Sequence, residues 1–465
     1  MVKKEEPKIG LLVASREFFP DELSFEGGQK VVDKLEDDGI EVITAFSPDE
    51  GKGLASSRED SKKYAELFKE RKDEITGVLV TLPNFGDEKS VVETFKLSDL
   101  DVPVMVHGFA DNLDEMDREH RRDSFCGKIS TCNNLRQSNI RFTDTKKHVE
   151  APESEEFEED LIKFKRICKT VDGLKDARLG AVGLRPNAFQ TVRFSEKILE
   201  GEGISVENVS LMKTLKESEN LEEDGSEVQE SLEMMDDYFD LNLPEEDAIK
   251  TAKLMTFLKN WITENELDAI SFQCWPDIEE YFGISPCGSM SLLSQSFMPS
   301  ACESDVMGSL SMYALQLASG KPTGLIDLNN NYGGEEDKFL TFHCSNFAPC
   351  FFENDECELG FHDMQGVNGA CHGRIDPGPV TFLRISTDDQ EGKVKAYIAE
   401  GRFTDDEVET FGGYGVAEVE DLESLMSFIV EEGFEHHTAM VKAHVGDAIE
   451  ESLDKYMGWD VYRHS

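Results

Sequence analysis

In the N-terminal third of the sequence, short apolar runs alternate with charged helical stretches, and this alternation restricts the fold more than any other feature. Gly27–Asp38 has its apolar residues at helical spacing. The runs with strand character are Lys8–Ala14, Ile40–Phe46, Ile75–Leu82 and Val102–His107. Strands separated by helices form βαβ units, so we predict a parallel sheet covered by helices.

The same pattern restarts further along the chain. A polar stretch, Thr143–Glu156, has the composition of a linker, and one helix is predicted at Phe157–Thr170. An acidic insertion, Glu217–Asp237, is expected to be a solvated loop or helix. The second set of predicted strands is Arg178–Leu184, Ile204–Val209 and Leu267–Cys274. A second α/β domain with a parallel sheet is therefore expected.

The pattern changes near Pro322, where short strands separated by Gly- and Asp-rich turns replace the alternation. These strands are predicted at Lys338–His343, Val380–Thr387 and Lys393–Glu400. Such a run predicts an antiparallel β domain, which helices after Glu420 would close off. We therefore expect three domains, with residues 1–172 and 173–325 as α/β domains and residues 326–465 as the β-rich domain.

The net charge argues against nucleic acid and anionic membranes as partners and indicates an acidic surface. The 47 Lys and Arg residues and 96 Asp and Glu residues give a formal charge of −49, spread over every segment. Such a chain repels nucleic acid and anionic membranes. Screening by salt reduces repulsion between surface acids, so we interpret the surface as an adaptation to high salt and the source as a halophile.

Targeting signals and cysteine spacing point to an intracellular protein. The apolar run before Arg16 is too short and too charged for a secretory signal. The uncharged run Tyr281–Cys302 is long enough to span a bilayer, but its Pro, Gly and Ser residues make a poor membrane helix. The ten cysteines form no CxxC pair, as expected for buried thiols. We therefore expect a cytoplasmic protein with no membrane contact.

The segment Ile284–Asp327 carries few charges for this chain, yet it keeps the acids Glu303, Asp305 and Asp327. Glu303 is predicted in the first turn of an apolar helix, Val306–Ala318, and Asp327 at the end of a short strand. An acid in a first helical turn can simply complement the helix dipole, and an Asp at a strand end can cap a turn. Buried carboxylates nevertheless need a partner, and a divalent cation is the obvious one.

Imidazole groups occur further along the chain. His343 ends a predicted apolar strand, and His436 and His437 lie between an acidic helix and a predicted amphipathic helix, Thr438–Met457. Each could also be a core, capping or exposed histidine. Two carboxylates with imidazole, and no thiolate pair, suit Mn²⁺, Mg²⁺ or Co²⁺ better than structural zinc. Motifs for NAD, ATP, serine-hydrolase and zincin chemistry are absent from the sequence.

Several of these motifs together resemble the L-fucose/L-arabinose isomerase superfamily. They are Cys126-Gly-Lys-Ile-Ser, Ala301-Cys-Glu-Ser-Asp-Val-Met-Gly-Ser-Leu, the step to Asp327, His343-Cys-Ser-Asn, Gly378-Pro-Val-Thr and His436-His437-Thr. The resemblance is strongest over residues 270–345 and collinear over the remainder. It implies two N-terminal Rossmann-like α/β domains with parallel sheets and a C-terminal antiparallel β-barrel domain.

The resemblance also implies roles for single residues. Glu303 and Asp327 would bind the metal and act as acid and base, and His437 would be the imidazole ligand. His343 matches an additional histidine ligand of the arabinose isomerases. Arg16 would contact the substrate in a neighbouring subunit's site, and His436 is a further candidate for substrate binding. The implied assembly is a homohexamer or another trimer-based homo-oligomer.

The activity implied is a metal-dependent aldose–ketose isomerisation of an L-fucose or L-arabinose type of sugar through a cis-enediol. Mn²⁺ is the expected cofactor, with Co²⁺ or Mg²⁺ as alternatives. The substrate alternative is a 6-modified hexose, such as a sulfonated glucose. A metal-dependent hydrolase or lyase, or a non-catalytic sugar-binding relative, could use the same scaffold.

Overall fold

A computed structural model describes residues 6–344, 346–352 and 357–464. The chain divides into two compact units, Lys4–Asp172 and Gly173–Ser465, and each is described by itself. The predicted boundary between a central and a C-terminal domain, within the second unit, stays a prediction. Ser345, part of the motif that follows His343, lies outside the described residues.

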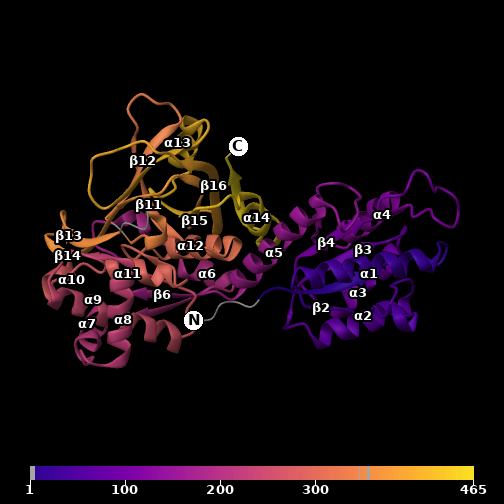
Figure 1. The fold of residues 1–465 in the computed structure, drawn as a ribbon, viewed down its shortest axis with the longest axis horizontal. Helices are drawn as coiled ribbons and strands as arrows, with labels where there is room; N and C mark the ends of the chain where they lie inside the picture. Colours follow the sequence, from indigo (N-terminus) through magenta and orange to yellow (C-terminus); the bar gives the residue numbers. More distant parts are fainter. Residues whose placement is uncertain (1–5, 345, 353–356, 465) are drawn as a thin grey trace. The chain divides into compact units, whose positions relative to one another are not determined.

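The first unit is built on a five-stranded parallel sheet with the order β2-β1-β3-β4-β5 (Figure 1). Its strands are β1 (Lys8–Val13), β2 (Val42–Ile43), β3 (Ile75–Leu82), β4 (Val104–Gly108) and β5 (Thr143–Asp144). The predicted strand Ile40–Phe46 is shorter in the structure. The stretch predicted as a linker contains β5 and the first residues of the next helix.

Helices cover both faces of this sheet, which confirms the predicted βαβ arrangement. They are α1 (Asp21–Asp37), α2 (Arg58–Glu70), α3 (Glu88–Ser98), α4 (Ser124–Gln137) and α5 (Glu155–Lys175). Apolar residues of α2, α3 and α4 form one core with the sheet, and those of α1 and α5 form another. Each strand is therefore buried on two sides, as its continuous apolar sequence predicts.

The second unit contains a parallel sheet with the order β10-β9-β6-β7. Its strands are β6 (Arg178–Val182), β7 (Ser205–Val209), β9 (Ala269–Phe272) and β10 (Ser300–Ala301). The acidic insertion is helical. The helices of this region are α6 (Glu196–Gly201), α7 (Leu211–Glu219), α8 (Ser226–Tyr238), α9 (Glu245–Glu264), α10 (Asp277–Tyr281), α11 (Cys287–Gln295) and α12 (Val306–Ser319).

A closed six-stranded antiparallel barrel follows, with the order β16-β15-β18-β11-β12-β17 and a return pairing of β17 with β16. Its strands are β11 (Gly324–Asn331), β12 (Lys338–His343), β15 (Gly378–Asp388), β16 (Lys393–Phe403), β17 (Gly413–Glu418) and β18 (His437–Val441). The predicted β-barrel is confirmed. The strands β8 (Asp240–Leu241), β13 (Glu358–His362), β14 (Val367–Arg374) and β19 (Asp460–Arg463) extend the sheet.

Three predictions about single elements are wrong. The amphipathic helix predicted over Thr438–Met457 begins instead as strand β18, buried at every residue, before α14 (Gly446–Glu450) and a π-helical turn (Glu451–Met457). A short apolar run fits a buried strand and a buried helix equally well. Glu303 precedes α12 because Asp305 is its N-cap. Asp327 lies within β11, which continues to Asn331.

Helix α12 lies between the parallel sheet and the barrel of the second unit. Twelve of its fourteen residues are buried. They pack on one side against strands β6 and β9 and on the other against barrel strands β15 and β18 (Figure 1). A helix that is apolar on all sides belongs inside a protein. The N-terminus of α12 is thereby fixed beside the barrel. Among the described residues, no helix combines the length and apolar character needed to cross a membrane.

Candidate metal centre

Strand pairing in the barrel places Asp327 and His437 side by side. In the antiparallel pair β11–β18, Asp327 lies directly opposite His437, so both side chains project from the same face. On the other side of β11, Asp327 pairs with Phe342, next to His343. Residues far apart in the sequence therefore meet in the barrel because their strands are neighbours.

Glu303 reaches this place from the turn between β10 and α12. Its backbone and that of Ser304 are left-handed, with φ of 63° and 57°. Such angles strain residues other than glycine and are found where the fold must direct a side chain. The indole Nε1 of Trp275 donates a hydrogen bond of 2.8 Å to Glu303 Oε1, which leaves Oε2 facing His437.

His437 contacts both carboxylates and belongs to both candidate ligand groups. Its Nε2 lies 3.0 Å from Glu303 Oε2 and 3.4 Å from Asp327 Oδ1, and its side chain is fully buried. Two groups have ligand atoms close enough together to hold a metal ion: Glu303, His343 and His437, and Asp327, His436 and His437. Both carboxylates therefore face the same nitrogen of His437, but each belongs to a separate candidate ligand group.

Two buried atoms of this centre, Asp327 Oδ1 and His343 Nε2, have no hydrogen-bond partner among the described residues, and His437 Nε2 has the Glu303 carboxylate as its nearest partner. Buried polar atoms without partners are rare and call for an explanation such as a bound ion. Carboxylate oxygens and imidazole nitrogens are ligands for Mn²⁺, Mg²⁺ or Co²⁺. The residues present thus fit a divalent metal ion, and the metal's identity stays a prediction.

The charges of the centre are strongly coupled. Burial lowers the pKa of His437, but hydrogen bonds to Asp305 and Glu303 outweigh this effect and raise its pKa to about 10. Burial raises the pKa of Glu303, whereas its hydrogen bond to His437 and the neighbouring imidazoles lower it below its usual value. The ionised carboxylates thus attract positive charge here, which a proton or a metal ion can provide.

His343 is placed at the centre, but one hydrogen bond argues against direct ligation. The backbone N–H of Cys344 donates to His343 Nδ1 at 3.0 Å. A neutral imidazole that accepts at Nδ1 carries its proton on Nε2, and an N–H group donates hydrogen bonds. Ligation by Nε2 would require this bond to break or the ring to turn over. The ligand role of His343 stays a prediction.

Two other predicted residues have different surroundings. His436 is 42% exposed, with Nε2 3.4 Å from Asp327 Oδ1. Its ring packs edge-on against Phe189, which also contacts His437 and Trp275. Arg16 lies in the other compact unit, where it pairs with Glu88 and packs over Phe85. Its donation to a neighbouring subunit's site stays a prediction.

Three residues around the centre were not predicted from the sequence: Trp275, Phe189 and Arg384. The aromatic pair could have been suspected, because Trp275 follows a predicted strand, where parallel sheets commonly place site residues. Arg384 lies in the middle of β15, where no sequence feature distinguishes it from other barrel residues.

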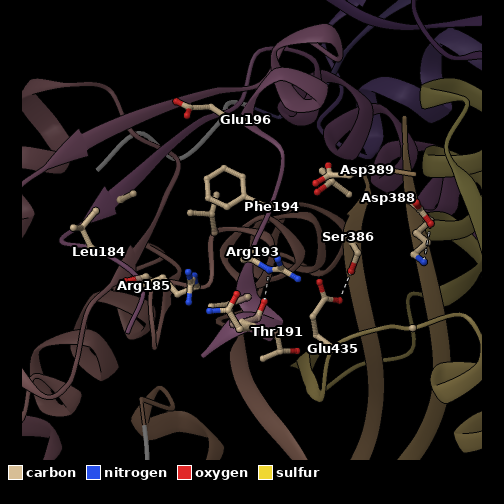
Figure 2. A pocket seen from close by; sticks show the side chains of 18 of the residues that line it. Leu184, Arg185, Thr191, Arg193, Phe194, Glu196, Ser386, Asp388, Asp389 and Glu435 are labelled. Atoms are coloured by element: carbon tan, nitrogen blue, oxygen red, sulfur yellow. Dashed lines mark hydrogen bonds and ion pairs between the residues drawn. The ribbon is translucent and has the colours of Figure 1, made fainter. Parts of the chain in front are cut away.

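A cavity of about 790 Å³ lies in the same unit (Figure 2). Ser304, which follows Glu303, and Glu435, which precedes the His pair, are among its lining residues. Arg185 and Arg193 come from the segment after β6, Asp388 is the last residue of β15, and Asp389 follows it. Glu303, Asp327, His343 and His437 are not among its lining residues, so the cavity lies beside the metal centre and does not contain it.

Two family models match the chain. The one described as fucose/sulfoquinovose isomerase, N-terminal domain, matches residues 10–175. The one described as L-fucose isomerase, C-terminal domain, matches residues 339–465. Together they cover more than half of the chain, and the second includes His343 and His437.

Curated relatives carry one name, sulfoquinovose isomerase. The protein of Priestia aryabhattai is 28% identical over 271 residues, which cover 57% of this chain and 59% of that relative's length. The protein of Alkalicoccus urumqiensis is 27% identical over 311 residues, covering 64% of this chain and 68% of the relative. That of Clostridium sp. (strain MSTE9) is 24% identical over 304 residues, covering 64% and 67%.

A solved structure, a periplasmic solute-binding protein of Actinobacillus succinogenes 130z with bound D-allose, matches with 9% identity and a TM-score of 0.17. The match covers 68% of this chain and 92% of that chain. A score this low carries no argument about this chain.

Proposed function

Because the chain belongs to the fucose isomerase-like superfamily, we propose that it is a sugar isomerase that interconverts an aldose and a ketose. The observation that carries this proposal is that the separate carboxylates of Glu303 and Asp327 both face Nε2 of the buried His437 imidazole, at 3.0 Å and 3.4 Å. Isomerisation needs two proton carriers that act on different atoms of one substrate, and two separated carboxylates can supply them.

The proposed substrate is a sulfonated hexose, that is, a glucose carrying a sulfonate at C6. The relatives of the preceding section are all named sulfoquinovose isomerase, and one matching family model includes that name. These names support the substrate alternative of the sequence analysis better than its first choice, a sugar of the L-fucose or L-arabinose type. Mn²⁺ is the proposed metal.

As the family resemblance implies, Glu303, Asp327 and His437 would hold the metal, with each carboxylate forming a candidate ligand group with His437 separately. A divalent ion supplies Lewis acidity to the two substrate oxygens and fixes their positions. Trp275 holds Oε1 of Glu303, so that carboxylate is oriented before substrate arrives. His343, with its proton on Nε2, would donate a hydrogen bond into the centre.

The carboxylates divide the proton transfers between them. The aldose loses the proton on C2 and the hydroxyl proton of that carbon, while C1 gains a proton and its oxygen becomes a hydroxyl. One carboxylate moves the carbon-bound proton between C2 and C1, and the other moves the proton between the two oxygens. The cis-enediol is the species between the two carbon proton transfers.

The test is a substrate panel with metal-stripped and Mn²⁺-loaded protein, with ketose formation followed by NMR. The panel contains sulfoquinovose, L-fucose, L-arabinose and D-arabinose, with D-glucose as the control that differs from sulfoquinovose only at C6. We expect the sulfonated ketose from loaded protein and no product after chelation. Glu303→Gln and Asp327→Asn should each be inactive, because each substitution removes both a ligand charge and a proton acceptor.

Each other outcome indicates a different function. Faster turnover of L-fucose or L-arabinose than of sulfoquinovose would indicate a substrate of the L-fucose or L-arabinose type. Cleavage of a bond would indicate a hydrolase or lyase. Binding without turnover would indicate a sugar-binding relative. Full turnover in excess EDTA, with no metal found by elemental analysis, would refute the metal centre.

A further inference from the structure

Asp305 is fully buried, and each of its two oxygens has two hydrogen-bond partners. Oδ1 accepts from the backbone N–H of Gly308 at 2.8 Å and from Arg384 Nη2 at 3.1 Å. Oδ2 accepts from Arg384 Nη1 at 2.5 Å and lies 2.9 Å from His437 Nδ1. No lone pair is left to bind a proton, so Asp305 can only accept at His437 Nδ1.

From this geometry we propose that Asp305 and Arg384 are a positioning pair, which keeps the proton of His437 on Nδ1 and directs Nε2 to the metal centre. The inference rests on the proposed function, because it takes His437 as a metal ligand. A carboxylate bonded to the far nitrogen of a metal-binding histidine fixes its tautomer and orientation and increases its basicity.

The carboxylate does more than capping requires. Asp305 is the N-cap of α12, and that role uses only the bond from Gly308 N–H to Oδ1. Ser, Thr or Asn would cap a helix about as well. Arg384 and His437 contact the second oxygen, Oδ2, and both interact favourably with its negative charge. These two contacts, and not capping, explain why an Asp occupies this position.

Arg384 compensates the negative charge of the buried Asp305 carboxylate. Its side chain is fully buried, and its Nε donates to Glu435 Oε2 at 3.0 Å, beside Ser386, which also donates to Glu435 (Figure 2). A buried charge without a partner is strongly destabilising. The planar guanidinium holds Asp305 through two parallel bonds, so it fixes the direction of the carboxylate as well as its charge.

The backbone leaves room for this arrangement. A Cβ atom at Gly308 would lie 2.6 Å from Asp305 Oδ2 and 2.8 Å from its Cγ. Any other residue at position 308 would push the carboxylate away from His437. The spacing of Asp305 and Gly308 in the sequence is thus part of the positioning device.

The test measures Mn²⁺ affinity by the EPR signal of free Mn²⁺ in full-length wild type, Asp305→Asn, Arg384→Gln and the double variant. Asp87→Asn is the matched control, because Asp87 caps α3 through Ser90 N–H and contacts no histidine of the centre. We expect Asp305→Asn to bind Mn²⁺ about 10- to 100-fold more weakly. The control should bind it as the wild type does.

The double variant separates positioning from stability. Arg384→Gln leaves both Asp305 and Glu435 without their guanidinium partner, whereas the double variant leaves only Glu435, so its melting temperature should recover relative to Arg384→Gln while its Mn²⁺ affinity stays low. Affinity that recovers together with stability would overturn the proposal. So would an Asp305→Asn protein that is folded and binds Mn²⁺ within twofold of wild type.

A measurement on the unmodified protein completes the test and does not depend on how the variants fold. Wild type labelled with ¹⁵N-histidine and loaded with Mg²⁺ should show His437 protonated at Nδ1, with His437→Ala used for assignment. A proton on Nε2 would overturn the positioning role. Wild type that binds no Mn²⁺ would overturn the metal centre itself, whereas normal binding by both wild type and Asp305→Asn would overturn the pair alone.

Discussion

His436 and His437 are adjacent in sequence but differ in burial, and this difference predicts different effects of substitution. His437 is fully buried with both nitrogens facing carboxylates, whereas His436 is 42% exposed. We expect His437→Ala to weaken Mn²⁺ binding at least about 100-fold, because it removes a ligand. His436→Ala should change Mn²⁺ affinity little and raise KM. Titration with Mn²⁺ and steady-state kinetics measure both effects.

The control for this comparison is His444→Ala, since His444 lies in the same unit, its Nε2 donates a hydrogen bond of 3.0 Å to Gly401 O, and it belongs to neither candidate ligand group. It should leave Mn²⁺ affinity and KM unchanged. If His436→Ala loses the metal and His437→Ala keeps it, the ligand assignment is off by one residue.

Glu150 and Asp160 predict a pH effect on stability in the first unit. Burial and the negative charge of Asp160 raise the pKa of Glu150 to about 7. Between pH 4.5 and 7 the unfolded chain loses this proton while the folded chain keeps it, so stability falls as pH rises through that interval. Glu150→Gln cannot ionise, and at pH 8 it should be more stable than wild type by about 1–3 kcal/mol.

Urea unfolding at pH 5, 6.5 and 8 measures this effect. The advantage of Glu150→Gln should shrink steadily towards pH 5. Glu153→Gln is the control, because Glu153 is an exposed acid of the same segment. An advantage for Glu150→Gln that is equal at all three pH values would mean that ionisation is not its cause.

The residues of the metal centre could be predicted from the sequence, whereas the residue that positions them through Asp305 could not. Glu303 and Asp327 stand out because their segment is otherwise poor in charge, and His437 because of its motif. Arg384 pairs with Asp305 across 79 residues, and only the barrel brings the two together. Such a contact depends on strand register, which no local pattern reveals.

At the scale of elements, the turn that presents Glu303 holds two consecutive left-handed residues, and this strain can be relieved. Ser304 has φ of 57°, and its buried Oγ has no hydrogen-bond partner in the part of the chain that the structure describes. Glycine adopts this conformation without strain. We expect Ser304→Gly to stabilise the protein by about 0.5–1 kcal/mol, after the larger entropy of the unfolded chain is subtracted. Chemical denaturation measures the change.

Ser309→Gly is the matched control, because Ser309 lies inside α12 with helical backbone. There the same substitution should destabilise the protein by about 1 kcal/mol. Equal effects of the two substitutions would show that the left-handed backbone at Ser304 stores no strain.

Short apolar runs set off by charged stretches were predictable as strands, whereas β18, which runs on into a helical pattern, was not. β3 occupies the predicted residues, as does β12, and an acidic residue precedes each strand. β18 was predicted as a helix, since His437–Val441 is too short to show a period and Lys442 and later residues continue with helical spacing. Its pairing with β11 and β15 decides its conformation, so tertiary contacts override the local signal.

For the whole molecule, the acidic surface predicts a dependence on salt. The excess of 49 acidic over basic side chains means that many carboxylates have no basic partner, even where ion pairs form. The Debye length falls from about 10 Å at 0.1 M salt to about 3 Å at 1 M. Repulsion between neighbouring surface carboxylates should therefore fade steeply over this range.

We expect folding, assembly and activity to need salt near or above about 1 M, where screening is nearly complete. Contacts between separate subunits generally bury less apolar surface than domain cores, so dilution should dissociate an oligomer before it unfolds either compact unit. Light scattering and circular dichroism, recorded together over a salt titration, resolve the two events. Potassium and sodium chloride at matched ionic strength serve as the control, because simple screening predicts the same midpoint for both. An unchanged assembly and full activity at low ionic strength would mean that the acidic surface has a purpose other than salt adaptation.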